Sequence, residues 1–120
     1  MGLAQVGART YFNSALTATK VAALGATTNA GYLLFNFTCF NSHATDVVYI
    51  QFFDAASADV TVGTTTPKFV LPLPPVGGID GGLMCPREFR TAVTIAATST
   101  ATGSGSPAAN ALVSFDYVSG

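Results

Sequence analysis

The segment 66–75, TPKFVLPLPP, alternates apolar side chains like a half-buried β-strand, yet it is crowded with prolines. Proline has no N–H to donate to a neighbouring strand. N–H groups two residues apart point to the same edge of a strand, so Pro72 and Pro74 remove donors from one edge only. This pattern predicts an edge strand that is protected against further pairing on its proline side. The donors left for pairing on the other side belong to Phe69, Leu71 and Leu73.

Other strand-like segments are separated by turn residues, and none shows a sustained helical period. They cover 17–24, 32–41, 45–54, 91–98 and 110–118. This spacing predicts an all-β fold: an antiparallel β-sandwich of six to eight strands, jelly-roll-like or immunoglobulin-like in architecture. The chain contains no Trp, so the Cys…Trp…Cys signature of true immunoglobulin domains is absent.

The strongest strand pattern is YLLFNFTCFN, residues 32–41. Both of its faces are partly apolar, which indicates that both are covered. With 45–54 it predicts a β-hairpin that has a four-residue loop at 41–44. The glycines of 76–82 predict a sharp turn, and 99–109 has the composition of a flexible linker. The expected core residues alternate along the strands: Leu33, Phe35, Phe37, Ile50, Phe52, Val93, Ile95, Val113 and Phe115.

The length of 120 residues suits a single domain. Residues 1–16 show no clean period and predict an N-terminal arm or a short edge strand. Residues 17–120 are assigned to the sandwich, which has the arm attached to it.

The chain is apolar and unusually poor in charge. Hydrophobic residues make up 49% of it and charged residues 9%, with five basic residues and a net charge of −1. A nucleic-acid partner is disfavoured because phosphate binding needs clustered Lys and Arg. Such a surface is often covered by neighbours, which predicts an oligomer or a larger assembly. No apolar run of about 18 residues or secretion signal is present. We therefore expect no membrane partner. We also expect the protein to be made and used without export.

No constellation of catalytic or metal-binding residues stands out. The six acidic residues do not pair at a useful spacing, and the loop carboxylates Asp54 and Asp59 fall short of a calcium site. His43 is the only histidine, and Cys39 and Cys85 are too few for a disulfide framework. We expect no catalytic, cofactor-binding or metal-binding residues, no cofactor and no enzymatic activity.

Two short segments are candidates for contacts with another protein. The N-terminal segment contributes Arg9, Tyr11 and Phe12, and the charged cluster PREFR contributes Arg87, Phe89 and Arg90. Arg and aromatic residues are favoured at protein interfaces. A solvated loop is the alternative interpretation of PREFR.

The chain resembles a group of small virion structural proteins of tailed bacteriophages. The resemblance spans about residues 30–118 and rests on an ordered series of segments. These are NSHATDVVYIQFFDAASADVTVGTTTPKFVLPLPP, then REFRTAVTIAATSTATGSGSP, then ANALVSFDY. The motifs mark strands and turns and carry no catalytic chemistry.

The resemblance implies a β-sandwich decoration (cement) protein that binds and stabilises the capsid shell. It implies the major capsid protein as partner, a homotrimer, a place on the capsid surface of the virion, and synthesis in the host cytoplasm. The alternative is a tail or fibre module, structural or adhesive, that binds carbohydrate or another tail protein. Sugar binding usually uses exposed aromatic residues beside polar groups, and most aromatic residues of this chain fall in strand patterns.

Overall fold

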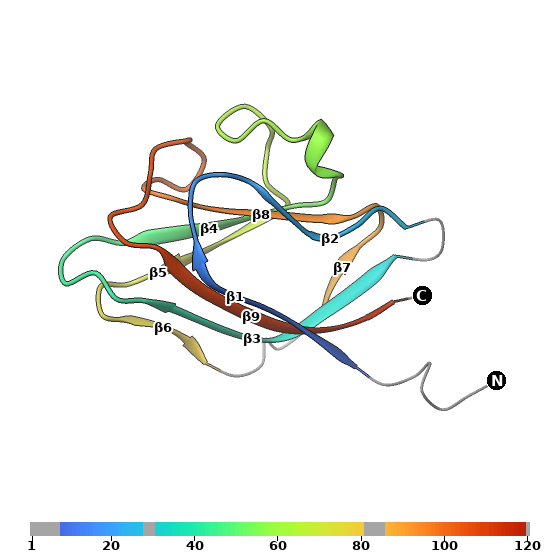
Figure 1. Ribbon diagram of the computed structural model, residues 1–120, viewed down its shortest axis with the longest axis horizontal. Helices are drawn as coiled ribbons and strands as arrows, with labels where there is room; N and C mark the ends of the chain where they lie inside the picture. Colours follow the sequence, from blue (N-terminus) through green and yellow to red (C-terminus); the bar gives the residue numbers. More distant parts are fainter. Residues whose placement is uncertain (1–7, 28–30, 81–85, 120) are drawn as a thin grey trace.

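The protein is a β-sandwich of nine strands in two antiparallel sheets, seen in a computed structural model that describes residues 8–27, 31–80 and 86–119 (Figure 1). Sheet I has the order β1 (Arg9–Leu16), β9 (Ala111–Ser119), β3 (Tyr32–Asn41), β6 (Gly77–Asp80), and β7 (Arg87–Phe89) also pairs with β3. Sheet II has the order β2 (Val21–Leu24), β8 (Val93–Thr98), β4 (Val48–Phe53), β5 (Phe69–Leu73). The described part also contains a single-turn 3₁₀ helix, η2 (Ser57–Asp59).

The topology is that of a jelly roll, one of the two architectures predicted. The chain behaves as one long folded hairpin, because β1 pairs with β9, β2 with β8, β3 with β6, and β4 with β5. Rolling this hairpin places these four pairs alternately in sheets I and II, which is the arrangement of two interlocked Greek keys. The additional pairs β9–β3 and β8–β4 complete the two sheets. Nothing helical in the described ranges attains the length and hydrophobicity needed to span a bilayer.

The predicted hairpin between 32–41 and 45–54 is wrong, because β3 and β4 lie in different sheets. The buried side chain of Asn41 fixes the corner between them. Its Nδ2 donates to the carbonyl oxygens of Asp46, Leu73 and Pro74 at 2.8, 3.2 and 3.2 Å, and its Oδ1 accepts from the N–H of His43 at 2.9 Å. These bonds redirect the chain from sheet I to sheet II instead of closing a two-stranded turn.

A β-bulge at Asn36 reverses the alternation of β3. Phe35 lies opposite Asp116 and Thr38 opposite Ser114, so β3 carries one extra residue between these pairs. Asn36 has φ +53°, the left-handed region that Asn tolerates and that many bulges use. Leu34 and Phe37 are therefore buried, whereas Leu33 is exposed and Phe35 half-buried. The predicted core positions Leu33 and Phe35 are wrong for this reason.

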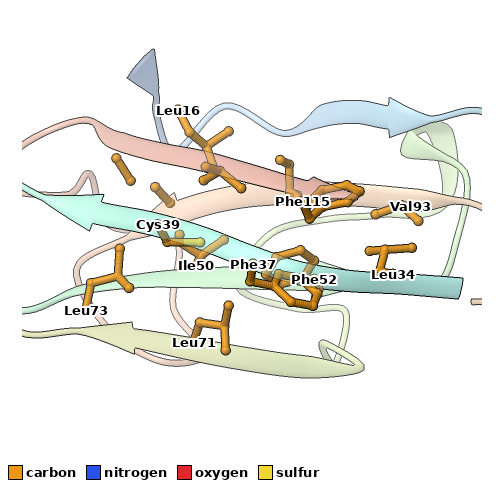
Figure 2. Close-up of a cluster of buried hydrophobic side chains, with 14 of the residues drawn as sticks. Leu16, Leu34, Phe37, Cys39, Ile50, Phe52, Leu71, Leu73, Val93 and Phe115 are labelled. Atoms are coloured by element: carbon orange, nitrogen blue, oxygen red, sulfur yellow. The ribbon is translucent and has the colours of Figure 1, made fainter. Parts of the chain in front are cut away.

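The remaining predicted core positions are confirmed. Ile50, Phe52, Val93, Ile95, Val113, Phe115 and Phe37 are all fully buried. Phe37 lies at the centre, with its ring 5.6 Å from Phe52, 5.8 Å from Phe115 and 5.9 Å from Phe69 (centroid to centroid). Figure 2 shows Phe37 of sheet I packed against Phe52 of sheet II. These rings join the two sheets.

The proline-rich segment forms β5, and its prediction as an edge strand is confirmed. In the described part of the chain β5 pairs with β4 alone, with Leu71 opposite Ile50 and Leu73 opposite Val48. Leu71 and Leu73 are buried, and Pro72 and Pro74 are exposed. The free edge therefore lacks donors at the two prolines.

Replacing Pro72 with Val and Pro74 with Thr should increase self-association, with little change in the folding of the monomer. The double variant restores two N–H donors and raises β propensity at an open edge. Light scattering over a concentration series checks the expected rise in mean mass. A double variant that stays as dispersed as the wild type would show that the prolines do not protect this edge.

One segment differs from its predicted role, and another takes the second of its two predicted forms. Residues 77–80 of the predicted glycine turn form β6, which pairs with β3 in sheet I. In the segment predicted as an arm or a short edge strand, Arg9–Leu16 form the edge strand β1, paired with β9. Leu16 is fully buried. The sandwich therefore includes residues 9–16 as well as the segment from residue 17 onward, and deleting 1–16 would remove one of its strands.

Candidate interaction face

The outer face of sheet II is covered over its central strands, β4 and β8, by the protein's own loops. Thr94 Oγ1 donates to the carbonyl oxygen of Ala55 at 2.8 Å, in the loop that follows β4. Gln51 Nε2 donates to the carbonyl oxygen of Gly103 at 2.9 Å, in the loop that follows β8. All six residues of β8 are buried, the outward-facing ones included. Figure 1 shows both loops on the side of β4 and β8 that faces away from sheet I.

The Gly/Ser/Thr loop 99–109 is fixed by hydrogen bonds and contacts inside the same chain, although its composition predicts a flexible linker. The N–H of Ser99 donates to the carbonyl oxygen of Gly105 at 3.0 Å, and the N–H of Gly103 donates to Thr100 Oγ1 at 3.0 Å. A Cβ added at Gly63 would lie 3.0 Å from the Cβ of Ser104, so this loop also touches the loop after β4. The two loops form one cover over sheet II.

The outer face of sheet I leaves several large apolar side chains exposed. The alternation of β1, β3 and β9 turns one set of apolar side chains away from the core. Phe12 is 60% exposed, Phe40 42% and Leu33 41%. The half-buried apolar side chains among them are Phe35, Leu112 and Val118. We call these six residues the apolar face.

A polar cluster lies in the middle of the apolar face. Thr10 Oγ1 of β1 donates to Asp116 Oδ1 of β9 at 2.8 Å, and Asn36 Nδ2 of β3 donates to Asp116 Oδ2 at 3.1 Å. The three side chains link three adjacent strands across the sheet. Asp116 is half-buried, and its neighbours in register are Phe35 and Thr10.

The three contact candidates of the N-terminal segment all lie on β1, but their side chains do not share one face. Phe12 belongs to the apolar face, and Arg9 is exposed at the start of the strand. Tyr11 points the other way: it is half-buried, and its ring stacks on Phe115 with centroids 5.2 Å apart. Its hydroxyl accepts a bond from Asn13 Nδ2 at 3.2 Å. Tyr11 therefore takes part in the fold.

The candidates of PREFR lie at the end of the sandwich around β7. Phe89 is fully buried in the core, so its ring cannot reach a partner. Arg87 and Arg90 are exposed. The guanidinium of Arg87 lies 4.9 Å from the centroid of the Phe69 ring, and Arg90 Nε lies 3.6 Å from Glu88 Oε1. The segment is thus a strand with two exposed arginines, and it borders the apolar face, because its Glu88 lies opposite Leu33.

Asp54 anchors the turn after β7. Its carboxylate accepts bonds from the N–H groups of Arg90, Thr91 and Ala92 at 3.1, 2.9 and 3.5 Å, and Lys68 Nζ lies 3.9 Å away. Burial alone would raise the pKa of Asp54. The three N–H donors and the Lys68 charge outweigh it and hold the pKa below its ordinary value of 3.8.

Asp54→Asn should lower the free energy of unfolding at pH 7 by about 1–2 kcal/mol, because it weakens three hydrogen bonds to a charged, partly exposed group. A lowered folded pKa means that the carboxylate stabilises the fold above its unfolded pKa, and this contribution is lost as the pH falls through the folded pKa. The difference between wild type and variant should therefore shrink below about pH 4. Urea denaturation at pH 7 and pH 3 checks this. An equal difference at both values would contradict it.

The groups with reactive potential are engaged structurally. Burial raises the pKa of Cys39 to about 12, although a backbone hydrogen bond from Ser114 acts in the opposite direction, so its thiol is a core group. His43 Nδ1 accepts from the N–H groups of Thr45 and Asp46 at 3.3 and 3.0 Å and shapes the turn after β3. No group of three His, Cys, Asp or Glu side chains suited to a metal occurs in the described ranges. Cys85 lies outside them.

Sequence reasoning missed most of the apolar face. Only Phe12 of its six residues is among the predicted contacts. The signal was present in 32–41, whose two faces are both partly apolar. The structure buries one of these faces in the core and leaves the other open.

Comparison of the chain with known proteins finds no matching family model, no matching curated protein and no matching solved structure.

Proposed function

We propose that this protein is a non-enzymatic virion structural protein that binds the phage capsid shell through the apolar face of sheet I. One observation carries the proposal: the outer faces of the two sheets differ in how far they are exposed. Loops of the same chain cover the central strands of sheet II, β4 and β8, whereas Phe12, Phe40 and Leu33 on sheet I remain 60%, 42% and 41% exposed. Monomeric proteins rarely leave large apolar patches open without an interaction to make.

The size of the apolar face suits a repeated, modest contact. The three strands that carry it, β1, β3 and β9, are about 4.8 Å apart and about nine residues long, which gives a face on the order of 450 Å², or about 900 Å² in total when covered. This is the lower end of specific interfaces. A homotrimer, as the phage resemblance implies, would present three such faces together, and linked faces bind far more tightly than one. The proposed partner is the major capsid protein, and the proposed location is the capsid surface.

The jelly roll is compatible with the proposal but does not select it. Viral capsid proteins and lectins both use this architecture, and one fold serves many functions. A carbohydrate-binding or adhesive tail module is the second candidate, supported by the polar cluster of Thr10, Asn36 and Asp116 beside exposed aromatic rings. The outer face of sheet I also carries Thr38, Ser114 and Glu88 in register with its apolar residues. Its most exposed large side chains are nevertheless apolar, Phe12, Phe40 and Leu33, which favours a protein partner.

The test is binding of the purified protein to capsid shells assembled without it. Co-sedimentation followed by quantitative mass spectrometry gives the number of copies per shell. A repeated shell contact predicts saturation at hundreds of copies, in step with the number of capsid subunits. Failure to bind shells, or a handful of copies confined to the tail of intact particles, would contradict the proposal and favour the tail module.

A further inference from the structure

Asp116 places a negative charge inside the face proposed to be covered. It lies on β9, between β1 and β3, opposite Phe35 of β3 and Thr10 of β1, and Phe12 is opposite Ser114, two residues along β9. Each carboxylate oxygen accepts one bond from a neutral donor, Thr10 or Asn36. A carboxylate oxygen can accept a second bond, so both oxygens keep capacity for a partner.

Covering this carboxylate without a counter-charge would be unfavourable. Removing an ionised carboxylate from water costs more than the burial of one apolar side chain contributes. The two neutral donors satisfy part of its hydrogen-bonding capacity but leave its charge. A partner that covers the apolar face must therefore bring a positive group to Asp116 or bind weakly.

The same charge disfavours a second copy of this chain as the occupant. Two sheet I faces packed against each other would bring two Asp116 carboxylates into one desolvated layer, where like charges repel. In the described ranges no basic side chain lies beside Asp116 in register: Arg9 is at the start of β1, Lys68 precedes β5, Lys20 precedes β2, and Arg87 and Arg90 lie around β7, where Arg90 is already 3.6 Å from Glu88 at the rim of the face. A heterologous surface avoids this repulsion.

We infer that the partner surface is apolar and carries one cationic side chain, which pairs with Asp116 when the face is covered. An arginine fits best, because its planar fork can donate to both carboxylate oxygens at once. This inference rests on the proposed function and names the chemistry that the shell must present. Asp116 then selects the partner and the register in which the sheet binds.

The test compares shell binding of four variants with the wild type, using capsid shells assembled without the protein. Asp116→Asn keeps the shape and removes the charge, and it should weaken binding at least about 30-fold, the cost of leaving a buried charge unpaired. Asp116→Leu should also weaken binding, although it makes the face more apolar. Asp116→Glu keeps the charge and should retain more affinity than Asp116→Asn. Asp59→Asn removes an exposed carboxylate from η2, on the covered side, and should bind as the wild type does.

The outcomes separate this inference from the function on which it rests. If the wild type binds shells and Asp116→Asn and Asp116→Leu bind them with equal or higher affinity, the inference is overturned and the proposed function stands. Light scattering on the free proteins tests the alternative that two copies of this chain bind each other through sheet I. A wild type that self-associates, with tighter self-association in Asp116→Leu, would also overturn the inference. A wild type that does not bind shells overturns both. Thermal unfolding of each variant confirms that the fold persists.

Discussion

Phe37→Ala should lower the free energy of unfolding by about 3–5 kcal/mol, whereas Phe35→Ala should cost only about 1 kcal/mol. The two residues are both Phe, two positions apart on one strand, and an unbroken strand would place them on the same face. The bulge at Asn36 separates them. Phe37 is fully buried among three other rings, and Phe35 is half-buried on the outer surface.

Urea denaturation of both variants measures the difference directly. Each serves as the control for the other, because the chemical change is identical. Similar losses for the two variants, or the larger loss at Phe35, would mean that β3 alternates without a bulge. Asn36→Gly should keep the bulge, since glycine adopts the left-handed conformation at least as readily as Asn, and should lose the exposed hydrogen bond to Asp116.

Gly31→Ala should destabilise the protein by about 3 kcal/mol or more, through strain and a backbone overlap together. Gly31 has φ +100°, a conformation that L side chains rarely adopt. A Cβ there would overlap the carbonyl oxygen of Phe89, the last residue of β7. Relief would require β7 to move away from β3 and would pull the buried Phe89 ring out of the core.

Gly25→Ala is the matched control for this substitution. A Cβ at Gly25 meets nothing within 4 Å, and its φ lies outside the positive range. The control should be neutral or stabilise slightly, because alanine reduces the freedom of the unfolded chain. Thermal unfolding compares the two. A small loss at Gly31, equal to that at Gly25, would contradict the close approach of β7 to β3.

The sequence predicts those parts of the fold that depend on local chemistry. The position of β5 at an edge follows from the missing N–H groups of Pro72 and Pro74, which no tertiary contact can replace. The sandwich class follows from the alternating patterns. Their residues 50, 52, 93, 95, 113 and 115 are all buried as expected.

The parts that were not predicted depend on distant contacts. The bulge needs only one residue with positive φ, and a single Asn at position 36 of an otherwise apolar strand does not predict a bulge. The passage from sheet I to sheet II at Asn41 depends on carbonyl groups of residues 73 and 74, which are far away in sequence. The same holds for the loop after β8, whose composition suggests mobility but whose bonds to Gln51 hold it over sheet II.

The candidate site was predicted in part for the same reason. Phe12 could be named from the sequence because it lies in a segment without a clear core pattern. Phe89 and Tyr11 could not be excluded, since their burial depends on packing against Phe52 and Phe115 of distant strands. The sequence does not tell which sheet the loops cover, so it could not predict that the apolar face of sheet I is left exposed.

The most direct test of the apolar face as the docking surface is the shell affinity of the double variant Phe12→Ser/Phe40→Ser. The matched control is Val76→Ser, because Val76 is 63% exposed, about as much as Phe12 at 60%, but lies in the turn between β5 and β6. Removing two exposed aromatic anchors should weaken binding at least about 100-fold while the control stays within about threefold of the wild type. A folded double variant that binds like the wild type, or a larger loss at Val76, would show that the protein docks through a different surface.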